Sequence, residues 1–67
     1  MDRGWIEDEL RRHFATARAA LGSALSEVQA CFISPDCLAA VLSEVGPGPT
    51  PERAILIWAI RRGDLWR

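Results

Sequence analysis

Large apolar residues and one alanine recur every three or four positions along residues 5–33, a stretch without proline. Their spacings are 4, 4, 3, 4, 4, 3 and 4. At about 100° per residue, these side chains fall within one arc of about 100° on a helical surface. The pattern therefore predicts one long helix over 5–33 with a core-facing stripe formed by Ile6, Leu10, Phe14, Ala17, Leu21, Leu25, Val28 and Phe32.

A second helix is predicted over 35–45 by its capping residues. Ser34 precedes Pro35, which is the order expected for an N-cap followed by the first helical residue. Gly46 and the proline after it are a typical C-terminal stop. Within these limits the apolar residues have the spacing of one core-facing stripe: Leu38, Val41, Leu42 and Val45.

A third helix is predicted over 51–62, because Thr50 and Pro51 repeat the cap and proline order and Gly63 provides a stop. Its large apolar side chains point in all directions around the helix: Ile55, Leu56, Ile57, Trp58 and Ile60. A helix that is apolar all round has to be buried on more than one side. With only two other helices predicted, we expect an apolar side of this helix to face solvent.

The predicted fold is a single all-α domain over 1–67, in which two shorter helices fold back along one long N-terminal helix. A chain of 67 residues has room for one domain, and such chains bury only about 60 % of their unfolded surface. The sequence has about 20 large apolar side chains, and three helices of this size cannot shield all of them from solvent. We therefore expect association with another protein chain, in a homo-oligomer or in a larger hetero-complex.

Composition and charge argue against several classes of function. The formal net charge of −1 is not typical of a nucleic-acid-binding protein. The longest apolar run, residues 54–60, is far shorter than the roughly 20 residues of a membrane span. The acidic N-terminal segment lacks the apolar region of a signal peptide, so a cytoplasmic location is expected.

Charge is also distributed unevenly along the chain. Residues 19–52 contain four acidic and no basic residues, whereas residues 53–67 contain four arginines and one acid. This layout predicts partial neutralisation within the chain if the basic tail folds across the acidic middle.

Few residues suggest site chemistry. Cys31 and Cys37 flank the predicted helix break, so they could form a disulfide or respond to oxidation, but we favour small buried apolar residues without a redox role. His13 has no second histidine to share a metal with, and a structural role is expected. No acid, base or nucleophile is paired by the sequence. We predict no enzymatic activity, no cofactor, no metal and no small-molecule substrate.

The back of the long helix, opposite the apolar stripe, is made of small residues: Ala15, Ala19, Gly22 and Ser26. Small side chains allow another helix to approach closely. The alternative is an exposed face on which alanine serves only as a good helix former.

We therefore expect a non-enzymatic protein–protein interaction module, such as a small adaptor, accessory subunit, chaperone or inhibitor. The predicted partner-binding residues lie in and after the last helix and on the small-residue back: Ile55, Leu56, Trp58, Arg61, Arg62, Trp66, Ala15, Ala19, Gly22 and Ser26. One alternative is a peripheral membrane module that places residues 55–58 and nearby arginines at the headgroup level. Another is a small nucleic-acid-binding regulator with a helix-turn-helix.

Overall fold

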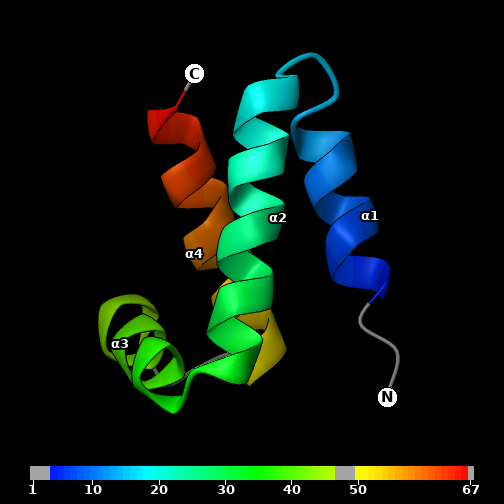
Figure 1. Ribbon diagram of the computed structural model, residues 1–67. Coiled ribbons are helices and arrows are strands. Elements are labelled where there is room, and N and C mark those ends of the chain that lie inside the picture. Colours follow the sequence, from blue (N-terminus) through cyan, green and yellow to red (C-terminus); the bar gives the residue numbers. More distant parts are fainter. Residues whose placement is uncertain (1–3, 47–49, 67) are drawn as a thin grey trace.

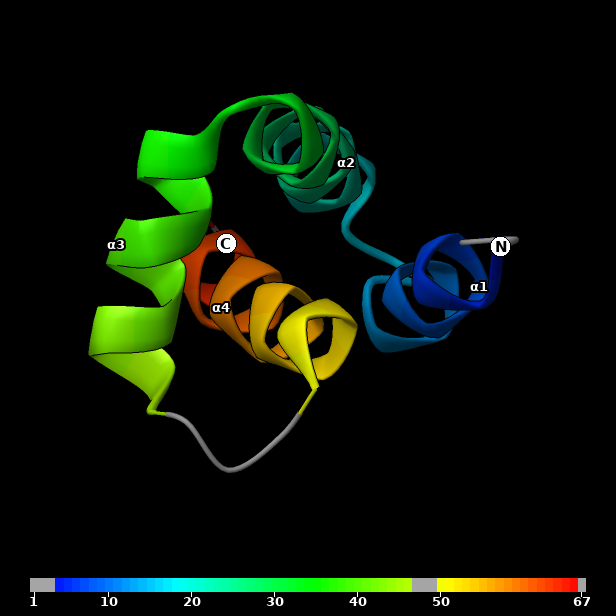
Figure 2. The same ribbon diagram turned by 90° about the horizontal axis from the view of Figure 1, so that it is seen from below.

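The computed structural model describes residues 4–46 and 50–66, and these residues form an all-α structure. Four helices follow one another in the two described ranges: α1 Gly4–His13, α2 Arg18–Ile33, α3 Pro35–Val45 and α4 Pro51–Leu65. α1 runs antiparallel to α2, and α3 crosses at the end of α2 (Figure 1). Seen along the α2 axis, α4 lies between α3 on one side and α1 on the other (Figure 2). The predicted all-α class is confirmed.

The predicted single helix over 5–33 is wrong, because the chain reverses at residues 14–17. The Phe14 amide still donates to the Leu10 carbonyl at 2.9 Å, and Ala17 then occupies the N-cap position of α2 without a side-chain hydrogen bond. An unbroken helix of that length would measure roughly 43 Å. The longest dimension of the folded chain is only 30 Å. Reversal lets the apolar side of α1 pack inside the fold instead of extending beyond it.

The reversal also changes which face of α2 is buried. In α1 and the turn, the predicted stripe is buried as expected, at Ile6, Leu10 and Phe14. In α2 the buried positions are Ala20, Ala24, Val28 and Cys31. Of the predicted stripe in this part of the chain, Val28 is buried as expected, whereas the other members lie at the margin of the core and are only partly buried: Ala17, Leu21, Leu25 and Phe32. The two buried alanines permit a close approach of α2 to its neighbours.

α3 has the predicted bounds and the predicted caps. The Ser34 hydroxyl oxygen accepts a hydrogen bond from the Cys37 amide at 3.3 Å. Gly46 ends the helix with a φ of 101°, a backbone conformation that favours glycine. The rest of the predicted connector, residues 47–49, lies outside the described residues.

α4 is the central helix of the fold. It begins as predicted, with the Thr50 hydroxyl accepting from the Arg53 amide at 3.3 Å, and it packs against α1, α2 and α3. Most of its large side chains are therefore buried, together with two alanines: Ala54, Ile55, Leu56, Trp58 and Ala59. The expectation that a large apolar side of this helix faces solvent is wrong. The reversal of α1 provides a third neighbour that the predicted arrangement lacked.

α4 also continues through Gly63, where the sequence predicted its end. Gly63 is buried against Phe14: an added Cβ would lie 2.9 Å from Cε2 and 3.0 Å from Cε1 of the ring, and closer still to Cζ. Beside this contact, His13 Nε2 lies 3.2 Å from Asp64 Oδ1. Gly63 thus allows the close approach of the turn at residues 14–17 to α4, and it does not stop the helix.

Gly63→Ala should destabilise the fold by about 1–3 kcal/mol, because the added methyl group overlaps the Phe14 ring. This sign is opposite to that of helix propensity, which favours alanine by about 1 kcal/mol. Gly22→Ala is the matched control, since, apart from its chain neighbours and the backbone of its own helix, no heavy atom lies within 4 Å of its added Cβ. That variant should be more stable by roughly 0.5–1 kcal/mol. Urea unfolding measures both, and a Gly63→Ala midpoint at or above wild type would contradict the packing argument.

Candidate functional site

Three large apolar side chains are prominently exposed among the described residues. Ile33 and Leu65 are each 84 % exposed, and Trp66 is 64 % exposed. Single exposed apolar residues are normal on protein surfaces, so the shape and charge around each one decide its significance. Ile33 lies at the end of α2, whereas Leu65 and Trp66 lie at the end of α4. Each of the two places adjoins a recess.

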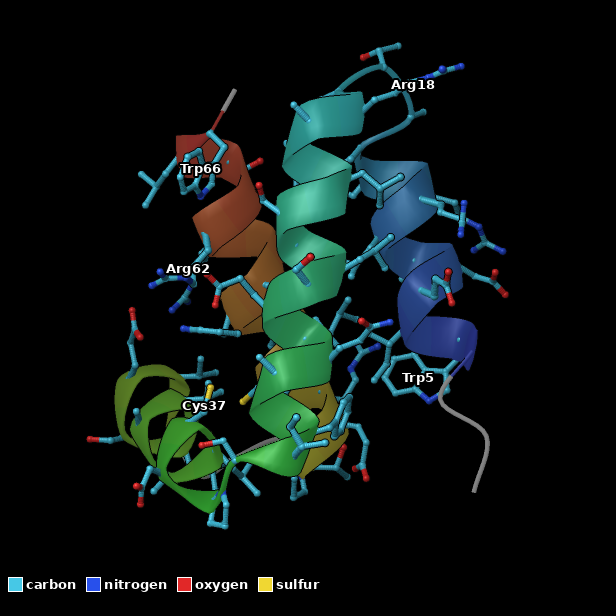
Figure 3. All side chains as sticks on the ribbon, in the orientation of Figure 1. Trp5, Arg18, Cys37, Arg62 and Trp66 are labelled. Atoms are coloured by element: carbon cyan, nitrogen blue, oxygen red, sulfur yellow. The ribbon has the colours of Figure 1, made fainter. Side chains whose placement is uncertain are left out.

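The first surface joins the end of α4 to one side of α2. Its recess has a volume of about 400 Å³ and lies beside Trp66. Arg62 is one helical turn before Trp66, and both project from the same side of α4 (Figure 3). We call this surface the α2–α4 patch and define it by Ser23, Ser26, Glu27, Ala30, Arg62 and Trp66.

The α2–α4 patch contains both signs of charge. Arg62 Nη2 lies 3.6 Å from Glu27 Oε1, and the two side chains are 44 % and 36 % exposed. The guanidinium carbon of Arg62 also lies 5.2 Å from the Trp58 ring centroid. Its Nε is buried and has no hydrogen-bond partner within the described part of the chain. This ion pair is the kind of contact expected between the basic tail and the acidic middle, although a partly exposed pair adds only about 0–1 kcal/mol of stability.

The second surface is a groove between α1 and α2. It has a volume of about 480 Å³, and α4 packs on the other side of this helix pair (Figure 2). The Glu7 carboxylate at its rim accepts a hydrogen bond from Arg11 at 2.6 Å. We call it the α1–α2 groove, lined by Gly4, Ile6, Glu7, Leu10, Leu25, Val28, Gln29, Phe32 and Ile33. Sequence reasoning missed this groove, because it exists only once α1 has folded back along α2.

The structure divides the predicted partner-binding residues between the core and the surface. Three of them are only 1 %, 5 % and 6 % exposed, so the fold buries Ile55, Leu56 and Trp58. The α2–α4 patch brings together three others that are far apart in sequence, namely Ser26, Arg62 and Trp66. Arg61 is exposed on the same end of α4. The remaining three are exposed, with the first in the turn before α2: Ala15, Ala19 and Gly22.

The burial of α4 also bears on the two alternative functions. In residues 55–58, which a membrane module would place at the headgroups, only Ile57 is partly exposed. Trp58, within the helix that would read DNA, is buried as well. Among the described helices none has by itself the length and apolar character of a membrane span. Taken together, α2 and α3 are long and apolar enough for a span, but the chain bends by 113° between them.

The thiols of Cys31 and Cys37 differ in accessibility. Both are free, and Cys31 is buried whereas Cys37 is partly exposed. The pKa of Cys31 is raised to about 12, mainly by burial. A hydrogen bond with Cys37 and the negative charges of Cys37 and Glu27 each make a smaller contribution to this increase. Cys31 therefore keeps its proton at neutral pH and is a poor nucleophile.

His13 stands on the outside of the fold and not in a site. Its ring packs edge-on against Phe14, with centroids 4.7 Å apart, and its Nε2 faces Asp64. Across residues 4–46 and 50–66, no three or more histidine, cysteine, aspartate or glutamate side chains are grouped to hold a metal ion.

Comparison of this chain with protein-family models, with curated proteins and with solved structures finds no match.

Thiol labelling of the folded chain at neutral pH should modify Cys37 quickly and leave Cys31 largely unmodified, because the Cys31 thiol is buried and its pKa is about 12. A chromogenic disulfide reagent should count one fast thiol per native chain and two in urea. Cys37→Ser should remove the fast thiol, and Cys31→Ser should retain it. Equal rates for both thiols in the native state would contradict the observed burial.

Proposed function

We propose that this chain is a non-enzymatic protein–protein interaction module, and that its α1–α2 groove binds an amphipathic helix of another protein. The proposal is carried by the exposure of Ile33, which is 84 % exposed where it lines a groove whose walls are mostly apolar side chains. Leu25 and Phe32 add partly exposed apolar surface beside it. An exposed apolar side chain that adjoins a recess of this kind favours a docking site over an isolated surface residue.

A helix is the favoured ligand because of the arrangement of the groove walls. α1 and α2 are antiparallel neighbours, and α4 packs on only one side of the pair (Figure 2). A helix laid into the opposite side would pack against both walls. It would present apolar residues at positions i, i+3 or i+4, and i+7, as in other helix-in-groove complexes.

The exposed carboxylate of Asp8 near the rim favours a partner helix with a basic flank. Glu7 lines the groove but is already paired with Arg11, whereas Asp8 beside it on α1 is exposed. Lysine or arginine next to the apolar stripe of the partner would complement Asp8 and orient the encounter. Adaptors, accessory subunits, chaperones and inhibitors all act by occupying a surface of another protein. The proposal differs from the sequence-based expectation in the surface used, since the middle of α4 is part of the core.

The groove is tested with a photo-crosslinking amino acid at Ile33, and with the same amino acid at exposed Ala39 on α3 as the matched control. The crosslinker at position 33 should capture a defined partner segment in cells of the native host, and position 39 should not. The captured segment is then made as a synthetic peptide. We expect it to be amphipathic, to become helical on binding, and to shift the NMR signals of Leu25 and Phe32.

Ile33→Asp should weaken binding of that peptide at least tenfold. Loss of a buried isoleucine corresponds to about 1.5–3 kcal/mol, and each 1.4 kcal/mol is a factor of about ten in affinity. Ala39→Asp should leave the affinity unchanged. A captured segment that binds equally well to Ile33→Asp, or that binds in an extended conformation, would rule out the groove as its docking site.

A further inference from the structure

We propose that the α2–α4 patch is a self-association surface, on which a second copy of this chain docks about a two-fold axis. The patch and the α1–α2 groove lie on different sides of α2. Residues 23, 26, 27 and 30 line the recess of the patch, whereas residues 25, 28, 29 and 32 line the groove. The dimer therefore goes beyond the proposed function and does not depend on it.

The shape of the patch is self-complementary. In a two-fold dimer the same patch is used by both chains, so it has to provide a projecting part and a receiving part. Trp66 is the projecting part, because it is large and 64 % exposed. The receiving part is the stripe of small side chains on α2, Ser23, Ser26 and Ala30, beside the recess. Tryptophan is enriched among the residues that contribute most to binding, and these residues fill well-packed pockets near the centre of an interface.

The charges of the patch also favour a second copy of this chain as its partner. Arg62 and Glu27 stand 3.6 Å apart, and both remain partly exposed. A two-fold axis that sets Arg62 against Glu27 of the second copy forms a cluster of four alternating charges. A patch with a single sign of charge would repel its own copy, whereas this patch attracts it. The net charge of −1 also gives little long-range repulsion between two chains.

A dimer of standard size would cover only a minor part of the chain's surface. The described chain exposes 4500 Å² in total. A stable interface of standard size buries about 800 Å² on each partner, and a single aromatic side chain contributes roughly 150–250 Å². Leu65 and Arg61 are exposed next to Trp66 and Arg62 on α4, so they extend the contact at the edge of the patch. Burial of about 800 Å² on each chain would correspond to a little under a fifth of the chain's total surface.

The test exchanges the charges of the patch. In a homodimer of Glu27→Arg, two arginines face each other at each contact, and in a homodimer of Arg62→Glu two glutamates do. Each variant alone should therefore sediment as a monomer at a concentration where the wild type is a dimer, on the order of 100 μM, with self-association at least tenfold weaker. Mixed in equal amounts, the two variants restore opposite charges at both contacts. The mixture should form a heterodimer.

The matched control is the Glu9–Arg12 pair on the surface of α1, with an N–O distance of 3.0 Å. Glu9→Arg and Arg12→Glu should each remain dimeric like the wild type. Ser26→Gln tests the shape of the recess without a change of charge, and since Ser26 is exposed the fold should tolerate it. Ser26→Gln should be monomeric, whereas Ala39→Gln on α3 should remain dimeric. Circular dichroism checks that each variant is folded.

Three results would overturn the dimer. They are a monomeric wild type at this concentration, patch variants that remain dimeric, and a mixture of the two charge variants that stays monomeric. A monomeric wild type whose Ser26 position crosslinks to a different protein would assign the patch to that protein instead. None of these results bears on Ile33 and its groove, so the two proposals fail separately.

Discussion

The whole structure depends on covering a helix whose central turns carry large apolar side chains in all directions. α4 meets this requirement because three other helices pack against it. The third of them, α1, reaches α4 only through the reversal at residues 14–17. Phe14 in that turn packs against buried Gly63, where a side chain on α4 would occupy the space of the ring. Contact between Phe14 and Gly63 therefore contributes to holding the reversed α1 against α4.

Capping residues in the sequence predicted the starts of the helices that have them. Ser34 and Thr50 each accept a backbone hydrogen bond at the start of a helix, and both helices begin where these residues indicate. The start of α2 has no such signal, because its N-cap is Ala17, which has no side-chain oxygen. The apolar residues keep the spacing of a single helix through the turn at residues 14–17. Only the long-range packing of α1 on α4 distinguishes a helical hairpin from one long helix, and single-sequence periodicity does not contain that information.

Because the sequence does not reveal long-range packing, the predicted partner-binding residues include both surface residues and core residues. Arg62 and Trp66 were predicted because they lie at the end of the last helix and just after it, and Ser26 was predicted from the small-residue pattern. These three share one surface. Ile55, Leu56 and Trp58 were assigned to a partner because three helices could not bury them, but the chain buries them itself with a fourth. The α1–α2 groove had no signal in the sequence, since its walls come from two helices that the periodicity had merged into one.

Closure of the core moves the available apolar surface from the middle of α4 to the ends of α2 and α4. Side chains at helix ends, such as Ile33 and Trp66, contribute little to the core, so their substitution separates binding from folding in a way that Trp58 does not allow. α2 contributes to both surfaces from different sides, through residues 25, 28, 29 and 32 and through residues 23, 26, 27 and 30. Occupation of one side leaves the other side of α2 accessible. A dimer formed at the patch would therefore present two grooves, and a partner with two suitable helices would bind it more tightly than either helix alone.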